Sequence, residues 1–315
     1  MSYIKENYIQ KNLMKQPKRQ TRDSNFELLR IFAMFSIILY HLLLYFIDPL
    51  SDNETIFKAL QLPLHVGVLL FVLISGYYGI RPTIKGALML LLPLVAYYMP
   101  LELGQAVTER SPEKILNSLF FFSYSPYWYV RTYFYLYLFS PVLNSFLRHK
   151  SAAEINYLTF ILLIVCIWLG LNKGDTSLEG GKNLLYFAVL YFVGNRIHIY
   201  KKVFQYSKHL ITTIYILLNI GIVLAYCIPS SMLQAIIIKT CYMYCSPILL
   251  LNAIIIFLLF SYLSIQNCKI NSFARSTYAM YIIHNQPSIL AFVISPIISY
   301  IWSISGGVRS SFCYL

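Results

Sequence analysis

Charged residues are scarce in this sequence. Asp, Glu, Lys and Arg make up only 12% of its 315 residues, whereas soluble domains carry about 25%. Apolar residues make up 58%, which is more apolar surface than a compact soluble fold could bury. The composition therefore excludes the water-soluble classes and predicts a protein that crosses a membrane several times.

Residue types that define fibrous or cross-linked proteins are also few. The 13 glycines and 13 prolines follow no period, which excludes a collagen-like chain. The six cysteines have no metal-ligand spacing with His or carboxylates, so we expect neither a metal site nor a disulfide framework. The net charge of +13 comes from 25 Lys and Arg against 12 Asp and Glu. In so apolar a chain this excess indicates basic cytoplasmic loops rather than contact with nucleic acid.

Apolar stretches of about 17–25 residues are long enough to cross the bilayer as helices. The sequence therefore predicts an all-α polytopic integral membrane helix bundle. Its expected helices lie near residues 27–47, 62–80, 86–105, 127–147, 155–171, 184–197, 210–228, 240–264 and 276–302. We interpret residues 1–24 as a basic cytoplasmic tail and residues 304–315 as a short polar end.

The distribution of basic residues predicts how the chain is oriented. With the N-terminus in the cytoplasm, the inner loops, among them 81–86 and 197–209, are rich in Lys and Arg. The outer loops, among them 48–61 and 172–183, carry most of the Asp and Glu. The asymmetry agrees with this orientation at almost every loop.

The first helix carries ionisable residues that are costly inside a bilayer and are therefore candidate functional residues. These are Glu27, Arg30 and His41. Arg30 and His41 are eleven positions apart, which brings the side chains back to within about 20° of one direction and about 16 Å apart along the helix. Such a pair suits a ligand with a phosphate head and a reactive end. The simpler alternative is that Arg30 contacts lipid phosphates and His41 contacts a neighbouring helix.

The second helix ends in small and polar residues that let a ligand or another helix come close, among them Ser75 and Tyr77. Arg81 and Lys85 follow on the side of the membrane where we expect Arg30. Together these residues suit an anionic cytoplasmic ligand. Ordinary positive charge in an inner loop explains Arg81 and Lys85 about as well.

Two further groups of candidates lie nearer the outer surface. Trp128 and Arg131 stand among tyrosines at the start of the fourth helix, where they suit either an interfacial aromatic belt or a sugar. His284 and Asn285, in the last helix, suit either a site or a hydrogen bond to a neighbouring helix.

Four segments, in order along the chain, resemble the membrane-bound acyltransferase-3 family of bacterial acyl-CoA-dependent O-acyltransferases. They are Arg30-x10-His41 preceded by Glu27, then FVLISGYYGI, YWYVRTYFYLYLFSPVLN and STYAMYIIHNQP. The resemblance covers most of the chain, from about Asn25 to Pro287, and implies an acyltransferase-3-like transmembrane domain over residues 25–303. It departs from the family at Arg81, Pro82 and Thr83, where some members have Arg-x-Arg, and at the end, where members continue into one more helix. We therefore interpret residues 304–315 as the end of a truncated member.

The resemblance implies nine to ten helices in a bacterial cytoplasmic membrane. It also implies transfer of an acyl group, usually acetyl, from acyl-CoA to a hydroxyl of a cell-surface or lipid-linked polysaccharide, with no permanently bound cofactor. His41, Arg30 and Glu27 are then the expected catalytic group. Ser75, Tyr77, Arg81 and Lys85 are expected on the donor side, and Trp128, Arg131, His284 and Asn285 on the acceptor side.

A competing interpretation is a secondary transporter or flippase, which would also place His and Arg within the membrane. Many transporters show a repeat between their two halves, with broken helices in matching positions. This sequence shows neither feature, which favours the enzyme.

Overall fold

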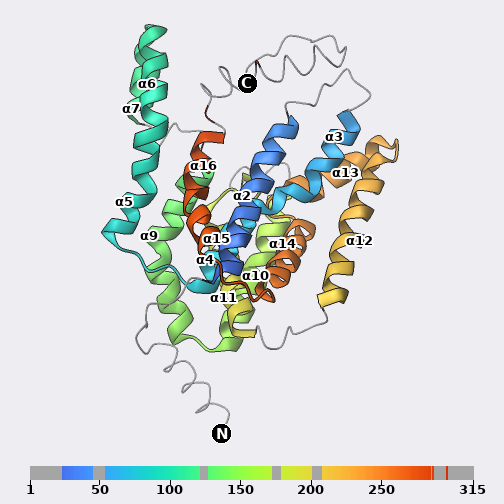
Figure 1. Ribbon diagram of the computed structural model, residues 1–315. Helices are drawn as coiled ribbons and strands as arrows, with labels where there is room; N and C mark the ends of the chain where they lie inside the picture. Colours follow the sequence, from blue (N-terminus) through green and yellow to red (C-terminus); the bar gives the residue numbers. More distant parts are fainter. Residues whose placement is uncertain are drawn as a thin grey trace.

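The computed structural model describes residues 23–44, 54–120, 127–171, 179–200, 208–284, 286 and 296. All regular structure in these ranges is helical, as the sequence predicts (Figure 1). Each expected helix overlaps a helix of the structure. The helices are α2 (Ser24–Leu44), α3 (Glu54–Gln61), η1 (Leu62–Val66), α4 (Gly67–Tyr78), α5 (Ile84–Pro93), η2 (Leu94–Tyr98), α6 (Met99–Thr108), α7 (Pro112–Leu119), α9 (Trp128–His149), α10 (Ala152–Gly170), η3 (Glu179–Gly181), α11 (Leu184–Tyr200), α12 (Lys208–Cys227), α13 (Ser231–Tyr242), α14 (Pro247–Ser261), α15 (Cys268–Phe273), η4 (Ala274–Ser276) and α16 (Thr277–His284).

The sequence predicts nine to ten membrane-spanning helices, but fewer of the described helices are by themselves long and apolar enough to cross a membrane. Among the described residues, five are long and apolar enough: Ser24–Leu44, Glu54–Tyr78, Ile84–Thr108, Ala152–Gly170 and Lys208–Cys227. The pair α13 and α14, bent by 51°, makes a sixth if it is one span. The helix α11 is apolar but has only 17 residues. The count of nine to ten spans therefore stays a prediction.

Residues 54–61 are helical in the structure, whereas the sequence predicts that they belong to an outer loop. Glu54 begins α3, which continues through η1 into α4. The Tyr242 hydroxyl donates to the Lys58 carbonyl at 3.0 Å, and the Gln61 side chain donates to the Tyr40 carbonyl at 3.0 Å. Contacts with helices distant in sequence hold this segment, and a search for apolar runs does not detect such contacts.

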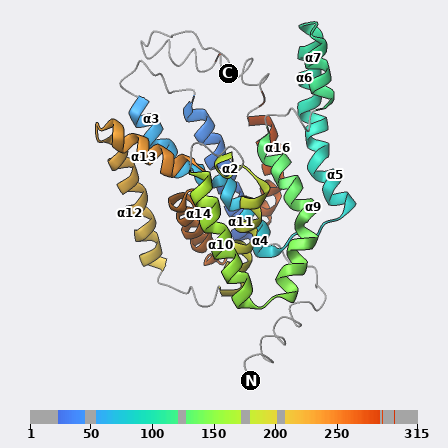
Figure 2. The ribbon, with the colours of Figure 1, turned by 180° about the vertical axis from the view of Figure 1, so that it is seen from behind.

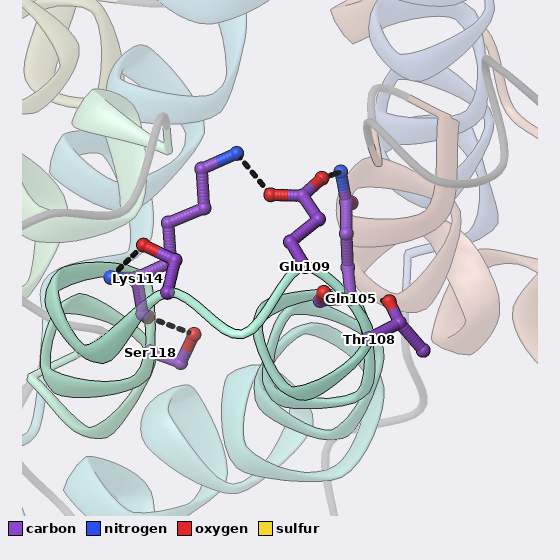
Figure 3. Close-up of polar contacts among 6 residues, drawn as sticks. Gln105, Thr108, Glu109, Lys114 and Ser118 are labelled. Carbon is purple, nitrogen blue, oxygen red and sulfur yellow. Dashed lines mark hydrogen bonds and ion pairs between the residues drawn. The ribbon is translucent and has the colours of Figure 1, made fainter.

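The helices α5 and α6 form one long rod that extends beyond the rest of the bundle and turns back as α7 (Figure 1). A π-helical stretch, η2, follows Pro93 inside this rod. Ser111 begins α7 by accepting a hydrogen bond from the Lys114 amide. Across the turn, Gln105 and Lys114 both donate to the Glu109 carboxylate (Figure 3). The Lys114 ammonium and the Gln105 amide hold the pKa of Glu109 below its ordinary value.

The backbones of α4 and α11 approach each other closely in the core. A Cβ atom on Gly76 would lie 2.1 Å from the Tyr191 carbonyl oxygen, and one on Gly194 would lie 2.3 Å from the Leu73 carbonyl oxygen. The two backbones are therefore in direct contact. This confirms that the small residues at the end of the second helix admit a neighbouring helix. On its other sides α11 contacts α9 and α10, as the view from behind shows (Figure 2).

The connections that the sequence assigns to the inner side gather at one end of the bundle. The Tyr78 hydroxyl donates to Asp23 at 2.8 Å, so the end of α4 lies beside the start of α2. The Asn267 amide donates to Ser24 at 2.9 Å, which brings the connection after α14 to the same place. Asn144 donates to the Ile80 carbonyl at 2.8 Å, which adds the end of α9. This arrangement agrees with inner loops on one side, while the side that faces the cytoplasm stays a prediction.

Candidate functional site

Two cavities lie beside α2, one near each end of this helix. The larger, of about 360 Å³, is here called the Arg30 cavity. Its lining residues are Glu27, Arg30, Phe71, Ser75, Leu90, Tyr129, Val130, Tyr133, Ala274, Arg275, Thr277, Tyr278 and Tyr281. The smaller, of about 90 Å³, is here called the His41 cavity. Its lining residues are Ile37, Tyr40, His41, Leu64, His65, Val68, Tyr127, Trp128, Tyr244, Tyr281 and His284.

One residue, Tyr281 of α16, lines both cavities. Its ring lies 5.5 Å from that of Tyr129, in the Arg30 cavity, and 5.4 Å from that of His284, in the His41 cavity. The two cavities are therefore neighbours. Arg30 and His41 open onto the same side of α2, as the spacing of eleven residues predicts.

The Arg30 cavity combines two guanidinium groups with one buried carboxylate. Arg30 donates to Glu27 at 2.7 Å, one turn earlier on α2, and Glu27 is 5% exposed. This ion pair fixes the direction of the Arg30 side chain. Arg275 of η4 lines the same cavity. Two guanidinium groups beside one opening suit an anionic ligand, because the planar fork of Arg matches phosphate oxygens.

Ser75 links the wall of the Arg30 cavity to α9. Its hydroxyl lies 2.9 Å from that of Tyr133 and 2.9 Å from the Phe71 carbonyl. The carbonyl can only accept, so Ser75 donates to it and Tyr133 donates to Ser75. The wall therefore unites the second and third segments of the family resemblance.

In the His41 cavity, backbone contacts determine which nitrogen of two imidazoles carries a proton. His41 Nδ1 lies 2.8 Å from the Ile37 carbonyl, and His284 Nδ1 lies 2.6 Å from the Tyr281 carbonyl. A carbonyl only accepts, so each Nδ1 donates. In a neutral ring this leaves a lone pair on Nε2. The two rings are 5.0 Å apart, and within the described part of the chain Nε2 of His284 has no hydrogen-bond partner.

Aromatic side chains form much of the remaining wall of the His41 cavity. The rings of Trp128 and Tyr244 lie 5.0 Å apart, and the Lys182 ammonium lies over the Trp128 ring, 5.5 Å from its centre. Tyr127 donates its hydroxyl to the Ile282 carbonyl, which ties the start of α9 to α16. Among the residues that the structure describes, no three His, Cys, Asp or Glu side chains are grouped to hold a metal ion.

The structure brings some of the sequence candidates together and leaves others apart. Glu27, Arg30 and Ser75 line one cavity, while His41, Trp128 and His284 line the other. The remaining candidates that the structure describes are not among the lining residues of either cavity: Tyr77, Arg81, Lys85 and Arg131. Asn285 lies outside the described residues.

Two of the expected donor-side residues are placed differently from the sequence expectation, for clear physical reasons. Tyr77 is buried in the core, where its ring packs against Phe26 at 4.8 Å and Phe257 at 5.4 Å. Arg81 is exposed in the connection after α4, whose backbone is held by Tyr191 through the Ile80 amide. Arg275, and not Arg81, lines the same cavity as Arg30. The donor-side role of Arg81 stays a prediction.

Sequence reasoning did not assign a role to Arg275, Tyr281 or His65. From the sequence, Arg275 is only one of the basic residues in the predicted inner loops. Tyr281 lies one helical turn before His284 in the last segment of the resemblance, which is the signal that could have found it. His65 was visible as a polar residue in an apolar run.

A family model described as an acyltransferase domain matches residues 23–312. The chain belongs to the acyltransferase-3 family. The match contains all the described residues and both cavities, and it supports membrane acyltransferase activity in general. The search of curated proteins and the search of solved structures gave no significant match.

Proposed function

We propose that this acyltransferase-3 protein transfers an acyl group, most simply acetyl, from cytoplasmic acyl-CoA to a hydroxyl of a cell-surface or lipid-linked polysaccharide. The observation that carries the proposal is the placement of Arg30 and His41 in neighbouring cavities that share Tyr281. One cavity offers groups that bind phosphates, and the other offers a group that accepts a proton. The protein would act in a bacterial cytoplasmic membrane with its N-terminus inside.

On the donor side, Arg30 and Arg275 would bind the phosphates of acyl-CoA at the mouth of the Arg30 cavity. Glu27 acts through Arg30, because its carboxylate is already paired with the guanidinium. The acyl thioester would then extend past Tyr281 toward His41. Acyl-CoA is a substrate in this scheme, and no permanently bound cofactor is required.

On the acceptor side, Nε2 of His41 takes the proton of the hydroxyl as its oxygen attacks the thioester carbonyl. The C–S bond breaks, the acyl group stays on the acceptor oxygen, and His41 returns the proton to the departing CoA thiolate. General-base catalysis of this kind contributes about 10²–10⁴-fold to the rate. A second route has Nε2 attack the thioester itself, so that an acyl-His forms and CoA leaves before the acceptor reacts.

Aromatic rings in the His41 cavity support a sugar as the acceptor. Trp128, Tyr127 and Tyr244 offer flat apolar faces beside His41, while Lys182 lies over Trp128. A sugar ring has apolar C–H faces that pack on such rings and hydroxyls that hydrogen-bond at its edge.

The test is transfer of label from [1-¹⁴C]acetyl-CoA to the glycan fraction of membranes that contain the protein. We expect covalently bound, alkali-labile label with the wild-type chain and none with correctly inserted His41→Ala. Label that accumulates inside sealed vesicles without covalent transfer would indicate the transporter instead. Absence of both signals would refute the proposed function.

A further inference from the structure

The two ring nitrogens of the buried residue His65 make no hydrogen bond to any residue that the structure describes. His65 lies in η1, just before α4, and lines the His41 cavity. The residue is 8% exposed, and neither ring nitrogen has a hydrogen-bond partner among the residues that the structure describes. Buried polar atoms are normally paired, so a side chain with two unpaired atoms on a cavity indicates a bound group that completes it.

The neighbours of His65 hold the ring in place without using its nitrogens. The Tyr244 ring lies 4.5 Å away, Tyr40 meets it edge-on at 4.8 Å, and Tyr242 lies at 5.7 Å. Packing therefore fixes the plane of the imidazole. A neutral imidazole has one hydrogen-bond donor and one acceptor. A hydroxyl group can both donate and accept, so it can hydrogen-bond to either ring nitrogen.

The position of His65 decides which substrate it faces. Ser75 lines the Arg30 cavity and follows His65 by ten positions on the same helical segment, which is roughly 15 Å. His65 is absent from the lining of the Arg30 cavity and shares the His41 cavity with Trp128. It is thus remote from the groups that suit phosphate and close to the aromatic wall that suits a sugar.

We propose that His65 is an acceptor-binding residue, which hydrogen-bonds a hydroxyl of a polyhydroxylated acceptor next to the hydroxyl that His41 deprotonates. This rests on the proposed function, because it presumes that the acceptor reacts in the His41 cavity. His65 takes no part in the bonds that form and break. It orients the acceptor so that a single hydroxyl faces His41.

Stability without substrate separates this role from a structural one. His65→Phe keeps an aromatic ring for the Tyr40 and Tyr244 contacts and removes both unpaired atoms. Replacing an unsatisfied polar group by an apolar one of similar shape is neutral or stabilising. We therefore expect an unchanged or higher melting temperature for the purified full-length chain in nanodiscs. If His65 had a structural role instead, the melting temperature of the variant would be lower than that of the wild type.

Kinetics provide the second readout. With labelled acetyl-CoA as donor and the membrane glycan fraction as acceptor, we expect His65→Phe to raise the apparent KM for acceptor roughly ten-fold. The KM for donor should stay unchanged. His65→Asn and His65→Gln each place an amide where one ring nitrogen was, so we expect one of them to restore the acceptor KM.

His198 supplies the matched control. Its ring packs 4.6 Å from that of Tyr77, and it lines neither cavity, so His198→Phe should leave both KM values unchanged. A lower melting temperature for His65→Phe, or an acceptor KM equal to wild type, would overturn the inference. If the wild-type chain transfers no label, the proposed function fails, and the melting temperatures still decide whether His65 is structural.

Discussion

The rings of His41 and His284 lie 5.0 Å apart, although one belongs to α2 and the other to α16. Each ring donates from Nδ1 to a backbone carbonyl of its own helix. The two Nε2 atoms are therefore the ones left for the cavity between the helices. The proposed function uses this arrangement, since the lone pair on Nε2 of His41 can accept the proton of an acceptor hydroxyl.

His41→Gln is expected to lower kcat by about 10²–10⁴-fold while leaving the apparent KM for acetyl-CoA within a few-fold of wild type. The amide can keep a hydrogen bond to the Ile37 carbonyl but cannot accept the proton of the acceptor. Label transfer at saturating donor measures the change. Wild-type transfer by a correctly inserted His41→Gln chain would show that His41 is not the base.

Arg30→Ala is expected to act on donor binding. Loss of a charge-assisted hydrogen bond to phosphate should raise the KM for acetyl-CoA roughly 10- to 100-fold, with a smaller effect on kcat. Arg81→Ala is the control, because Arg81 lines neither cavity. Equal KM values for the two variants would remove Arg30 from the donor site.

Gly76→Ala and Gly221→Ala should change stability in opposite directions. The first places a Cβ atom 2.1 Å from the Tyr191 carbonyl oxygen and forces α4 and α11 apart, at a cost of about 1–3 kcal/mol. The second meets nothing within 4 Å on α12 and should stabilise that helix by about 0.5–1 kcal/mol. Melting temperatures in nanodiscs compare them. A stabilised Gly76→Ala chain would contradict the close contact of the two helices.

The hairpin of α6 and α7 should loosen in acid. The pKa of Glu109 lies below its ordinary value of 4.5, mainly because Lys114 donates to the carboxylate. A depressed pKa in the folded state means that the stabilisation is complete above pH 4.5 and is lost as the pH falls through the folded-state pKa. Amide hydrogen exchange in α7, followed between neutral and acidic pH, measures this. In Lys114→Ala the dependence on pH should shrink, and an unchanged profile would exclude the pair as its cause.

Orientation can be tested with single cysteines in a chain that lacks its native ones. Lys85 and Glu113 are both exposed and lie in segments that the charge asymmetry assigns to opposite sides. An impermeant thiol reagent should label Glu113→Cys in intact cells and Lys85→Cys only after permeabilisation. The reverse pattern would invert the predicted orientation.

Much of the candidate site follows from spacing along one helix. The positions of Glu27, Arg30 and His41 predict a pair at the helix start and a histidine three turns further along the same side, and the structure has both. A helix has a regular period, so residues within it can be placed without knowing their neighbours. The places of Tyr77 and Arg81 could not be predicted in this way, because each depends on which helix packs against the end of α4.

The sequence by itself determined that the chain is helical and apolar, and that Arg30 and His41 share a side of their helix. Composition and periodicity are properties of single segments, and the bilayer leaves a chain of this composition few structures other than helices. Only the tertiary structure decided that Arg275 lines the same cavity as Arg30, that Tyr281 lines both cavities, and that His284 and His65 line the same cavity as His41. These contacts join segments that are distant in the chain, and they arise from close packing of helices such as α4 and α11, where the glycines remove the side chains that would keep the backbones apart.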